Sequence, residues 1–128
     1  MTMNRTMLGA ALAGSLIAGG AVAATSHRMS VSGVTKGSTV TIQGEAQCPP
    51  QQRCEPQITA TLTLKSGALV KNERHDLSPE AKLNGERWEW HEDFSMDDLP
   101  ADKTFAGSIE VESSVEVTFK NVSATVRR

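Results

Sequence analysis

Apolar residues recur at every second position over much of this 128-residue chain. The clearest run places Ile58, Ala60, Leu62 and Leu64 on one parity, with threonines between them. Side chains repeat every two residues along a strand and every 3.6 residues along a helix, so this alternation predicts half-buried strands. The same alternation returns in residues 29–34, 39–43, 88–96, 105–111 and 115–126. Short strands separated by turns, with no long helical pattern, predict an all-β antiparallel sandwich.

The run from Ile58 to Leu64 predicts a central strand, because one complete parity is apolar. Residues 68–77 are more highly charged and predict an edge strand. Lys36-Gly37-Ser38 and Ser66-Gly67 are typical of turns. Pro79 predicts a single helical turn over residues 78–83, which Asn84-Gly85 would end.

Two later segments depart from simple alternation. Trp88, Trp90, Phe94 and Met96 share one parity with Glu92, so we expect either a bend or a carboxylate that reaches the rim. Ser113-Ser114 is predicted to end the preceding strand. In the last strand the apolar parity changes after Phe119, which predicts a β-bulge near Lys120-Asn121.

The N-terminus has the three zones of a signal peptide: a start with one positive charge at Arg5, an apolar run rich in glycine and alanine, and small residues at Ala23 and Ala24. We predict that residues 1–24 are removed and that residues 25–128 form one domain. Cleavage after Ala23 is an open alternative. The run is too short and too rich in glycine for a membrane span, so no membrane insertion is expected after cleavage. The predicted location is periplasmic or secreted.

Cys48 and Cys54 are the only cysteines, and they flank Pro-Pro-Gln-Gln-Arg. In an oxidising compartment such a close pair predicts a disulfide that fixes a loop. The spacing is not that of a redox Cys-x-x-Cys motif. The formal net charge of −2, with no cluster of lysine and arginine in the sequence, argues against nucleic acid as a partner.

Three segments resemble a known family. Lys36–Ala46 is similar to an early strand of bacterial immunoglobulin-like domains, Asn84–Trp90 to their Gly-x-Trp strand entry, and Leu99–Phe105 to the corner before their penultimate strand. The chain has Asp102-Lys103 where that family favours Asp-Gly. The resemblance implies an immunoglobulin-like β-sandwich of about seven strands, used for display, spacing or adhesion. It implies no catalytic residue.

A metal site is conceivable at the new N-terminus. After cleavage at Ala24 the chain would begin Thr25-Ser26-His27, and its amine, two amides and imidazole form a nitrogen set suited to Cu(II). Met29 adds a sulfur ligand for Cu(I). Cleavage at Ala23 would remove the amino-terminal geometry.

The remaining polar groups favour simpler interpretations. His75 and His91 are read as solvated surface residues. The acidic residues between Glu89 and Asp102 lack the spacing of an EF-hand, so calcium binding is not favoured. The sequence has no motif that would place a pair of carboxylates or a nucleophile for catalysis. Asn121-Val122-Ser123 is interpreted as a glycosylation triplet that arose by chance.

These observations predict a non-enzymatic binding or structural module that acts through protein–protein interaction. The long alternating segment Val115–Val126 is a candidate for strand addition with a partner protein, although closure of its own sheet competes with that use. One alternative is a periplasmic copper-binding protein that uses Thr25, His27 and Met29. Another is an inhibitor of a secreted hydrolase that presents the disulfide loop with Arg53 at its tip. The oligomeric state is left open.

Overall fold

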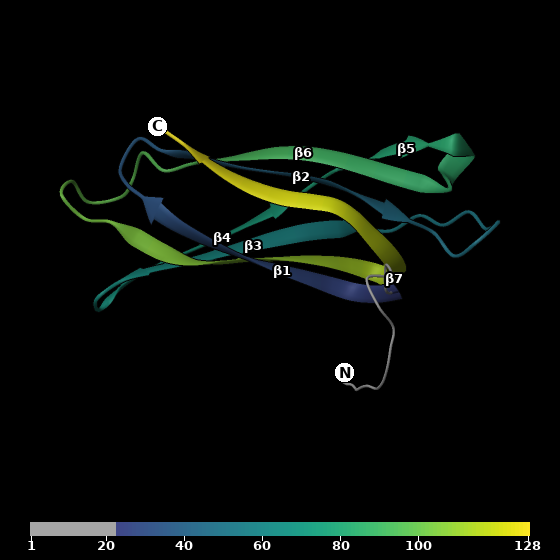
Figure 1. The fold of residues 1–128 in the computed structure, drawn as a ribbon, viewed down its shortest axis with the longest axis horizontal. Helices are drawn as coiled ribbons and strands as arrows, with labels where there is room; N and C mark the ends of the chain where they lie inside the picture. Colours follow the sequence, from purple (N-terminus) through teal and green to yellow (C-terminus); the bar gives the residue numbers. More distant parts are fainter. Residues whose placement is uncertain (1–22) are drawn as a thin grey trace.

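The strands of the computed structural model, which describes residues 23–128, form one antiparallel sheet that curls over on itself (Figure 1). The elements are β1 (Ala23–Val34), β2 (Thr39–Gln47), β3 (Ile58–Ser66), β4 (Leu69–Asp76), β5 (Glu80–Lys82), the 3₁₀ turn η1 (Leu83–Gly85), β6 (Arg87–Ser95) and β7 (Phe105–Arg127). The all-β antiparallel prediction is therefore confirmed. Most of the predicted signal peptide lies outside the described residues, and Ala23 and Ala24 are the first residues of β1.

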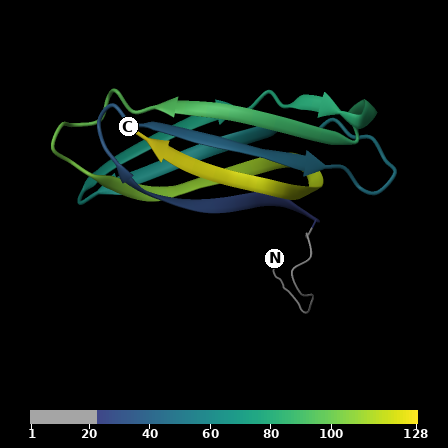
Figure 2. The same cartoon turned by 45° about the horizontal axis from the view of Figure 1, so that its top comes forward.

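The sheet curls because β7 belongs to both of its halves. Residues 106–113 of β7 pair with β3, and residues 105–118 pair with β1. Residues 118–127 pair with β2 instead. The strand order is β4-β3-β7-β2-β6-β5, with β1 joined to β7 from the side. Figure 2 shows β7 bending at one end of the molecule as it passes from one half of the sheet to the other.

The bend in β7 lies between Ser113, where pairing with β3 ends, and Thr118, where pairing with β2 begins. The sequence predicted a strand end at Ser113-Ser114. That prediction is wrong, because the two serines satisfy backbone groups across the irregularity and β7 continues. The Ser113 hydroxyl accepts a hydrogen bond from the Val115 amide at 3.3 Å. The Ser114 hydroxyl accepts one from the Gln57 amide at 2.8 Å, and the Ser114 amide donates to the Gln57 carbonyl at 2.9 Å.

The predicted alternation is what fills the core. Ile58, Ala60, Leu62 and Leu64 of β3 are all fully buried, and their threonine neighbours are partly exposed. β3 lies between β4 and β7, and β4 lies at the edge of the sheet, so both positions predicted from the sequence are confirmed. β1 begins earlier than residue 29, because pairing with β7 extends it back to Ala23.

The predicted bulge is present where β7 meets β2. The register passes from Gln43 opposite Ser123 to Glu45 opposite Lys120, and Asn121 adopts a φ of 54°. Gly44 lies at the same irregularity. A Cβ atom there would lie 2.9 Å from both Trp90 Cζ2 and Val122 Cγ2, so only glycine fits without a shift of its neighbours.

The helical turn predicted for residues 78–83 is wrong. Residues 80–82 form β5, in which Ala81 is paired with Trp88, and only residues 83–85 form a 3₁₀ turn. Pairing with β6 satisfies this backbone, and Ser78 at a φ of 44° interrupts the turn that Pro79 would have begun.

Glu92 shares the apolar parity of β6, and the approach of β4 to β6 provides a partner for its carboxylate. His75 of β4 lies with its ring stacked on Phe94 at a centroid distance of 4.0 Å, and its Nδ1 is 2.8 Å from Glu92 Oε2. Its Nε2 is 2.6 Å from Glu73 Oε2. The prediction of a solvated His75 is therefore wrong, since its side chain is only 24% exposed. His91 is exposed, as predicted.

Lys71 continues this row of inward-facing charged groups on β4. Its ammonium lies 3.0 Å from Glu73 and 2.7 Å from Asp98, and its side chain is only 12% exposed. Together Asp98, Lys71, Glu73, His75 and Glu92 form a continuous chain of ionisable side chains, which we call the charged border. It joins β4 to the β6–β7 loop and to β6 through side chains.

Candidate functional site

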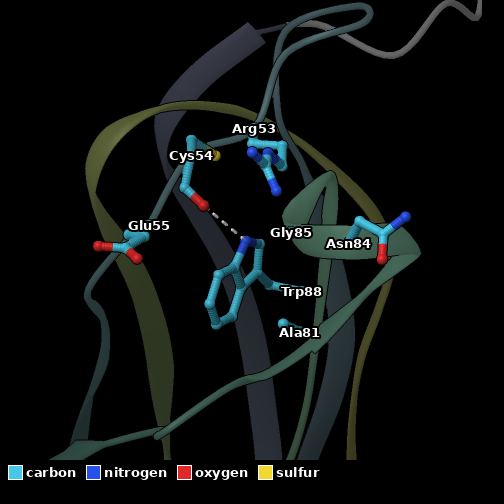
Figure 3. Close-up of a pocket in the computed structure, with 7 residues that line it drawn as sticks. All are labelled: Arg53, Cys54, Glu55, Ala81, Asn84, Gly85 and Trp88. Carbon is cyan, nitrogen blue, oxygen red and sulfur yellow. Dashed lines mark hydrogen bonds between the residues drawn. The ribbon is translucent and has the colours of Figure 1, made fainter.

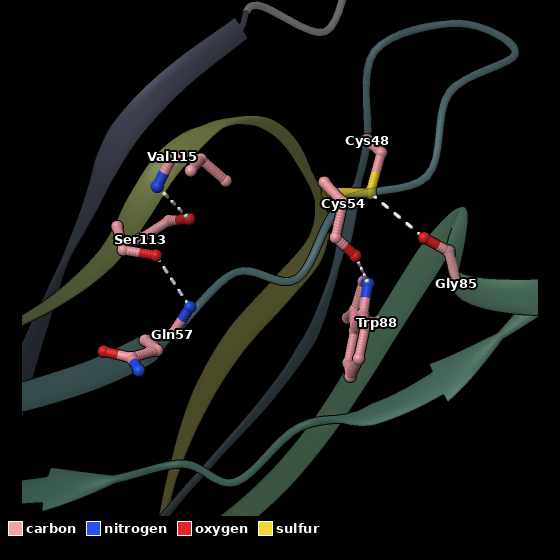
Figure 4. Close-up of a disulfide and its surroundings, with 8 residues drawn as sticks. Cys48, Cys54, Gln57, Gly85, Trp88, Ser113 and Val115 are labelled. Carbon is pink, nitrogen blue, oxygen red and sulfur yellow. Dashed lines mark hydrogen bonds between the residues drawn. A yellow bond between two sulfur atoms is a disulfide. The ribbon is translucent and has the colours of Figure 1, made fainter.

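The loop between β2 and β3 and the turn between β5 and β6 meet at one end of the sheet, which we call the disulfide end. The predicted disulfide between Cys48 and Cys54 is present, with a Cα–Cα distance of 5.8 Å. The Cys48 amide donates to the Glu86 carbonyl at 2.9 Å, and the Cys54 amide donates to the Gly85 carbonyl at 3.2 Å. Figure 4 shows the disulfide beside Gly85 and Trp88. The disulfide and these bonds hold an otherwise irregular loop against η1.

A hollow of about 680 Å³ lies between this loop and the β5–β6 turn (Figure 3). The indole of Trp88 forms part of its wall, and its Nε1 donates to the Cys54 carbonyl at 3.0 Å. The lining residues are Arg53, Cys54, Glu55, Ala81, Asn84, Gly85 and Trp88. The hollow therefore combines an aromatic surface, a guanidinium and a carboxylate. Tryptophan and arginine are enriched in protein–protein interfaces.

Arg53 lies in the rim of this hollow. The turn that reverses the disulfide loop is at residues 49–52, where the Gln52 amide donates to the Pro49 carbonyl at 3.0 Å, so Arg53 follows the tip and does not form it. The Arg53 stem lies over Gly85: a Cβ atom built on that glycine would be 3.7 Å from Arg53 Cδ. The Arg53 stem thus packs over Gly85, whose φ of 88° is a conformation that favours glycine.

Leu83 is the most exposed large hydrophobic residue in the described part of the chain, at 59%. Its backbone has a φ of 51°, and Asn84 and Gly85 after it have φ values of 57° and 88°. A left-handed conformation is unfavourable for leucine and costs on the order of 1–3 kcal/mol. The structure thus holds an apolar side chain in solvent, beside the hollow, in a strained backbone conformation.

The charges beside Leu83 form a local pair. Lys82 Nζ lies 2.9 Å from Glu80 Oε1. The hydrogen bond from Lys82 lowers the pKa of the Glu80 carboxyl, and the same bond raises the pKa of the Lys82 ammonium. Both groups are in solvent, so the pair stays charged at neutral pH and contributes little to stability.

None of the three predicted copper ligands lines this hollow. Thr25, His27 and Met29 are all in β1, where His27 is opposite Val111 and Met29 opposite Ile109 of β7. The His27 ring lies 5.9 Å from that of Phe119. Wrapping the amides of residues 26 and 27 around a square-planar ion would require the start of β1 to leave β7, so this site stays a prediction.

Among residues 23–128 no three side chains of the His, Cys, Asp and Glu types come together in a way that would hold a metal ion. The acidic residues considered for calcium have other partners. Glu92 contacts His75, and Asp98 contacts Lys71.

Sequence reasoning selected Arg53 but missed Trp88 and Leu83 as possible site residues. The strong turn at Asn84-Gly85 was the available signal, because such a turn brings its neighbours to the end of a sheet. The loop that this turn faces depends on the order of the strands in the sheet, which the sequence did not reveal.

The search for related proteins gave no match to a family model, to a curated protein or to a solved structure. Within the described residues, none of the helical structure has the length and apolar character required to cross a membrane.

Proposed function

We propose that this chain is an exported immunoglobulin-like module without enzymatic activity, and that it binds a protein partner through the disulfide end. The observation that carries the proposal is Leu83, an exposed leucine held at positive φ beside a hollow that contains Trp88 and Arg53. Residues held in a strained backbone conformation cluster at binding and active sites.

The composition of this end supports protein recognition. Tryptophan and arginine are enriched among the residues that contribute most to binding energy in interfaces. Arg53 and Leu83 lie on two different loops, and the disulfide and the bonds to Gly85 and Glu86 hold these loops together. A surface organised before binding loses less conformational entropy when a partner docks.

Export is supported by the same region. A disulfide that closes a short loop persists in oxidising compartments, and the N-terminal sequence has the zones of a signal peptide. These two features together support a periplasmic or secreted location. The immunoglobulin-like assignment is supported by the all-β antiparallel sheet and the three sequence segments described above.

The test compares capture of envelope proteins by the tagged protein and by three variants. Leu83→Asn keeps a residue type that tolerates positive φ, and Arg53→Ala removes the guanidinium. Val70→Ser is the matched control, because Val70 is 58% exposed at the opposite end. We expect a defined partner, identified by mass spectrometry, to be lost at least tenfold with the first two variants and retained with the third.

Equal capture by all four proteins would contradict the proposal. Leu83→Asn separates binding from folding, because relief of the strained φ should leave the thermal midpoint unchanged or raise it while binding falls.

A further inference from the structure

A second surface lies along the border between β1 and residues 119–127 of β7, which we call the open border. In the described part of the chain, β1 pairs only with residues 105–118 of β7, and residues 119–127 pair only with β2. Each strand therefore has one edge with unpaired backbone groups. The two strands meet where Ala23 is opposite Thr118, and Arg128 Nη2 contacts the Gly33 carbonyl at 3.1 Å near their other ends (Figure 2).

The open border is where the core is least completely covered. The hydrophobic residues that pack against the core while remaining partly exposed come mainly from these two strands. Apart from Cys54, they are Met29, Phe119, Val122, Ala124 and Val126. Each alternates with polar residues along its strand, so an added strand with apolar side chains at the same spacing would cover them.

The charge of the open border is uniform. Residues 23–34 and 117–128 contain no aspartate or glutamate, although the whole chain has a net charge of −2. Their cations are Arg28, Lys120, Arg127 and Arg128. The fold thus assembles, from segments at opposite ends of the sequence, a basic surface that inspection of the sequence did not reveal.

The carboxylates that approach these cations do so at long range and on exposed side chains. Arg28 lies 3.7 Å from Glu110, and Arg127 lies 3.9 Å from Asp93. Exposed pairs of this kind contribute about 0–1 kcal/mol, so an incoming carboxylate can replace them at low cost.

We propose that the open border binds an extended segment of a partner protein, in which apolar residues alternate with acidic ones, by strand addition along residues 119–127 of β7. Backbone hydrogen bonds to the free edge would supply affinity. The apolar side chains would cover Phe119 and Val122, and the acidic ones would face the cations. The surface is separate from the disulfide end and does not depend on that site's function.

The bulge at Asn121 limits where a strand can pair. A bulge and a neighbouring lysine are features that protect sheet edges from unselective pairing. Here they lie near the bend, which leaves residues 122–127 as the regular part of the edge. Regular pairing is thus restricted to a short segment of the edge. The basic residues of the open border favour a partner segment with negative charge.

The experiment measures binding of a ten-residue peptide of alternating valine and glutamate by titration calorimetry and amide exchange. We expect binding that weakens as salt rises, with slower exchange at amides of residues 119–127. A valine–lysine peptide of the same length should bind at least tenfold more weakly. Two further valine–glutamate peptides carry N-methyl groups on every valine or on every glutamate, and at least one should fail to bind because its pairing edge is blocked.

The protein variants use matched charge reversals. Lys120→Glu with Arg127→Glu should weaken binding at least tenfold, whereas Lys65→Glu with Lys103→Glu, also at exposed sites, should not. Leu83→Asn should bind the peptide like the unmodified protein, which distinguishes this surface from the disulfide end. Absence of binding by the unmodified valine–glutamate peptide, undiminished binding of both N-methylated peptides, or protection confined to other strands would overturn the proposal.

Discussion

The two long borders of the curled sheet differ in how their edge strands are covered. At the charged border, β4 turns Lys71, Glu73 and His75 inward, and these side chains reach across to β6 and to the following loop. At the open border, β1 and the second half of β7 leave apolar residues partly exposed, and their charges are all basic. Inward charges are a known means of protecting an edge strand. Within residues 23–128, side chains therefore cover one border, whereas the strands of the other border each keep one edge without a paired strand.

The largest expected difference concerns one phenylalanine from each border. Phe94 is fully buried beneath His75, and Phe94→Ala should lower the free energy of unfolding by about 3–5 kcal/mol. Phe119 is only partly buried, so Phe119→Ala should cost roughly half as much or less, because less apolar area is lost. Urea denaturation of both variants measures the difference. Equal losses would show that the open border is packed as tightly as the charged one.

A smaller effect is expected from the histidine of the charged border. His75→Ala leaves Glu92 facing inward without its partner, which should cost on the order of 1–3 kcal/mol. His91 is exposed on β6, and His91→Ala should change stability by less than about 0.5 kcal/mol. If both variants unfold at the same urea concentration, the charged border does not hold β4 to β6.

The ion pair between Lys71 and Asp98 should give the charged border a modest dependence on pH. The hydrogen bond from Lys71 lowers the pKa of the Asp98 carboxyl below its usual 3.8. Burial alone would lower the pKa of Lys71, but the hydrogen bonds to Asp98 and Glu73 outweigh it and raise that pKa above 10.5. A lowered acid pKa stabilises the fold above 3.8, and this contribution is lost as the pH falls through the folded-state value.

The raised amine pKa acts in the opposite direction, since its contribution is present below pH 10.5 and is lost as the pH rises through the folded-state value. Thermal midpoints recorded below pH 4 and above pH 10 should therefore fall less steeply for Lys71→Met than for the unmodified protein. Parallel profiles for the two proteins would contradict this role of the pair.

The smallest effect is expected at the open border. Arg128→Ala removes the side-chain contact to the Gly33 carbonyl, which is exposed to solvent. Stability should change by less than about 0.5 kcal/mol, as for most surface substitutions. A loss above 1 kcal/mol in urea denaturation would mean that this border is closed by the C-terminal arginine.

The period of the side chains explains why much of the fold was predictable. Burial on one face imposes alternation, and this identified β3 as central, β4 as an edge and the bulge near Asn121. The disulfide followed from two close cysteines. The failures, at Ser113-Ser114 and at residues 78–83, lie where pairing with a distant strand or a serine hydroxyl satisfies a backbone that local signals would interrupt.

The candidate sites depended more on the tertiary structure. Arg53 was selected from its loop, but its proximity to Trp88 and Leu83 arises only when β2, β5 and β6 are brought to one end. The partner of Glu92 could not be inferred either, because it comes from a strand in the other half of the sheet.

By itself the sequence determined that the described chain is built of strands, which faces of those strands are buried, and where one loop is cross-linked, because each of these depends on neighbours along the chain. Only the tertiary structure decided which edges are sealed and which are left open. The covering of an edge depends on contacts between residues far apart in sequence, such as His75 with Glu92 and Arg128 with Gly33.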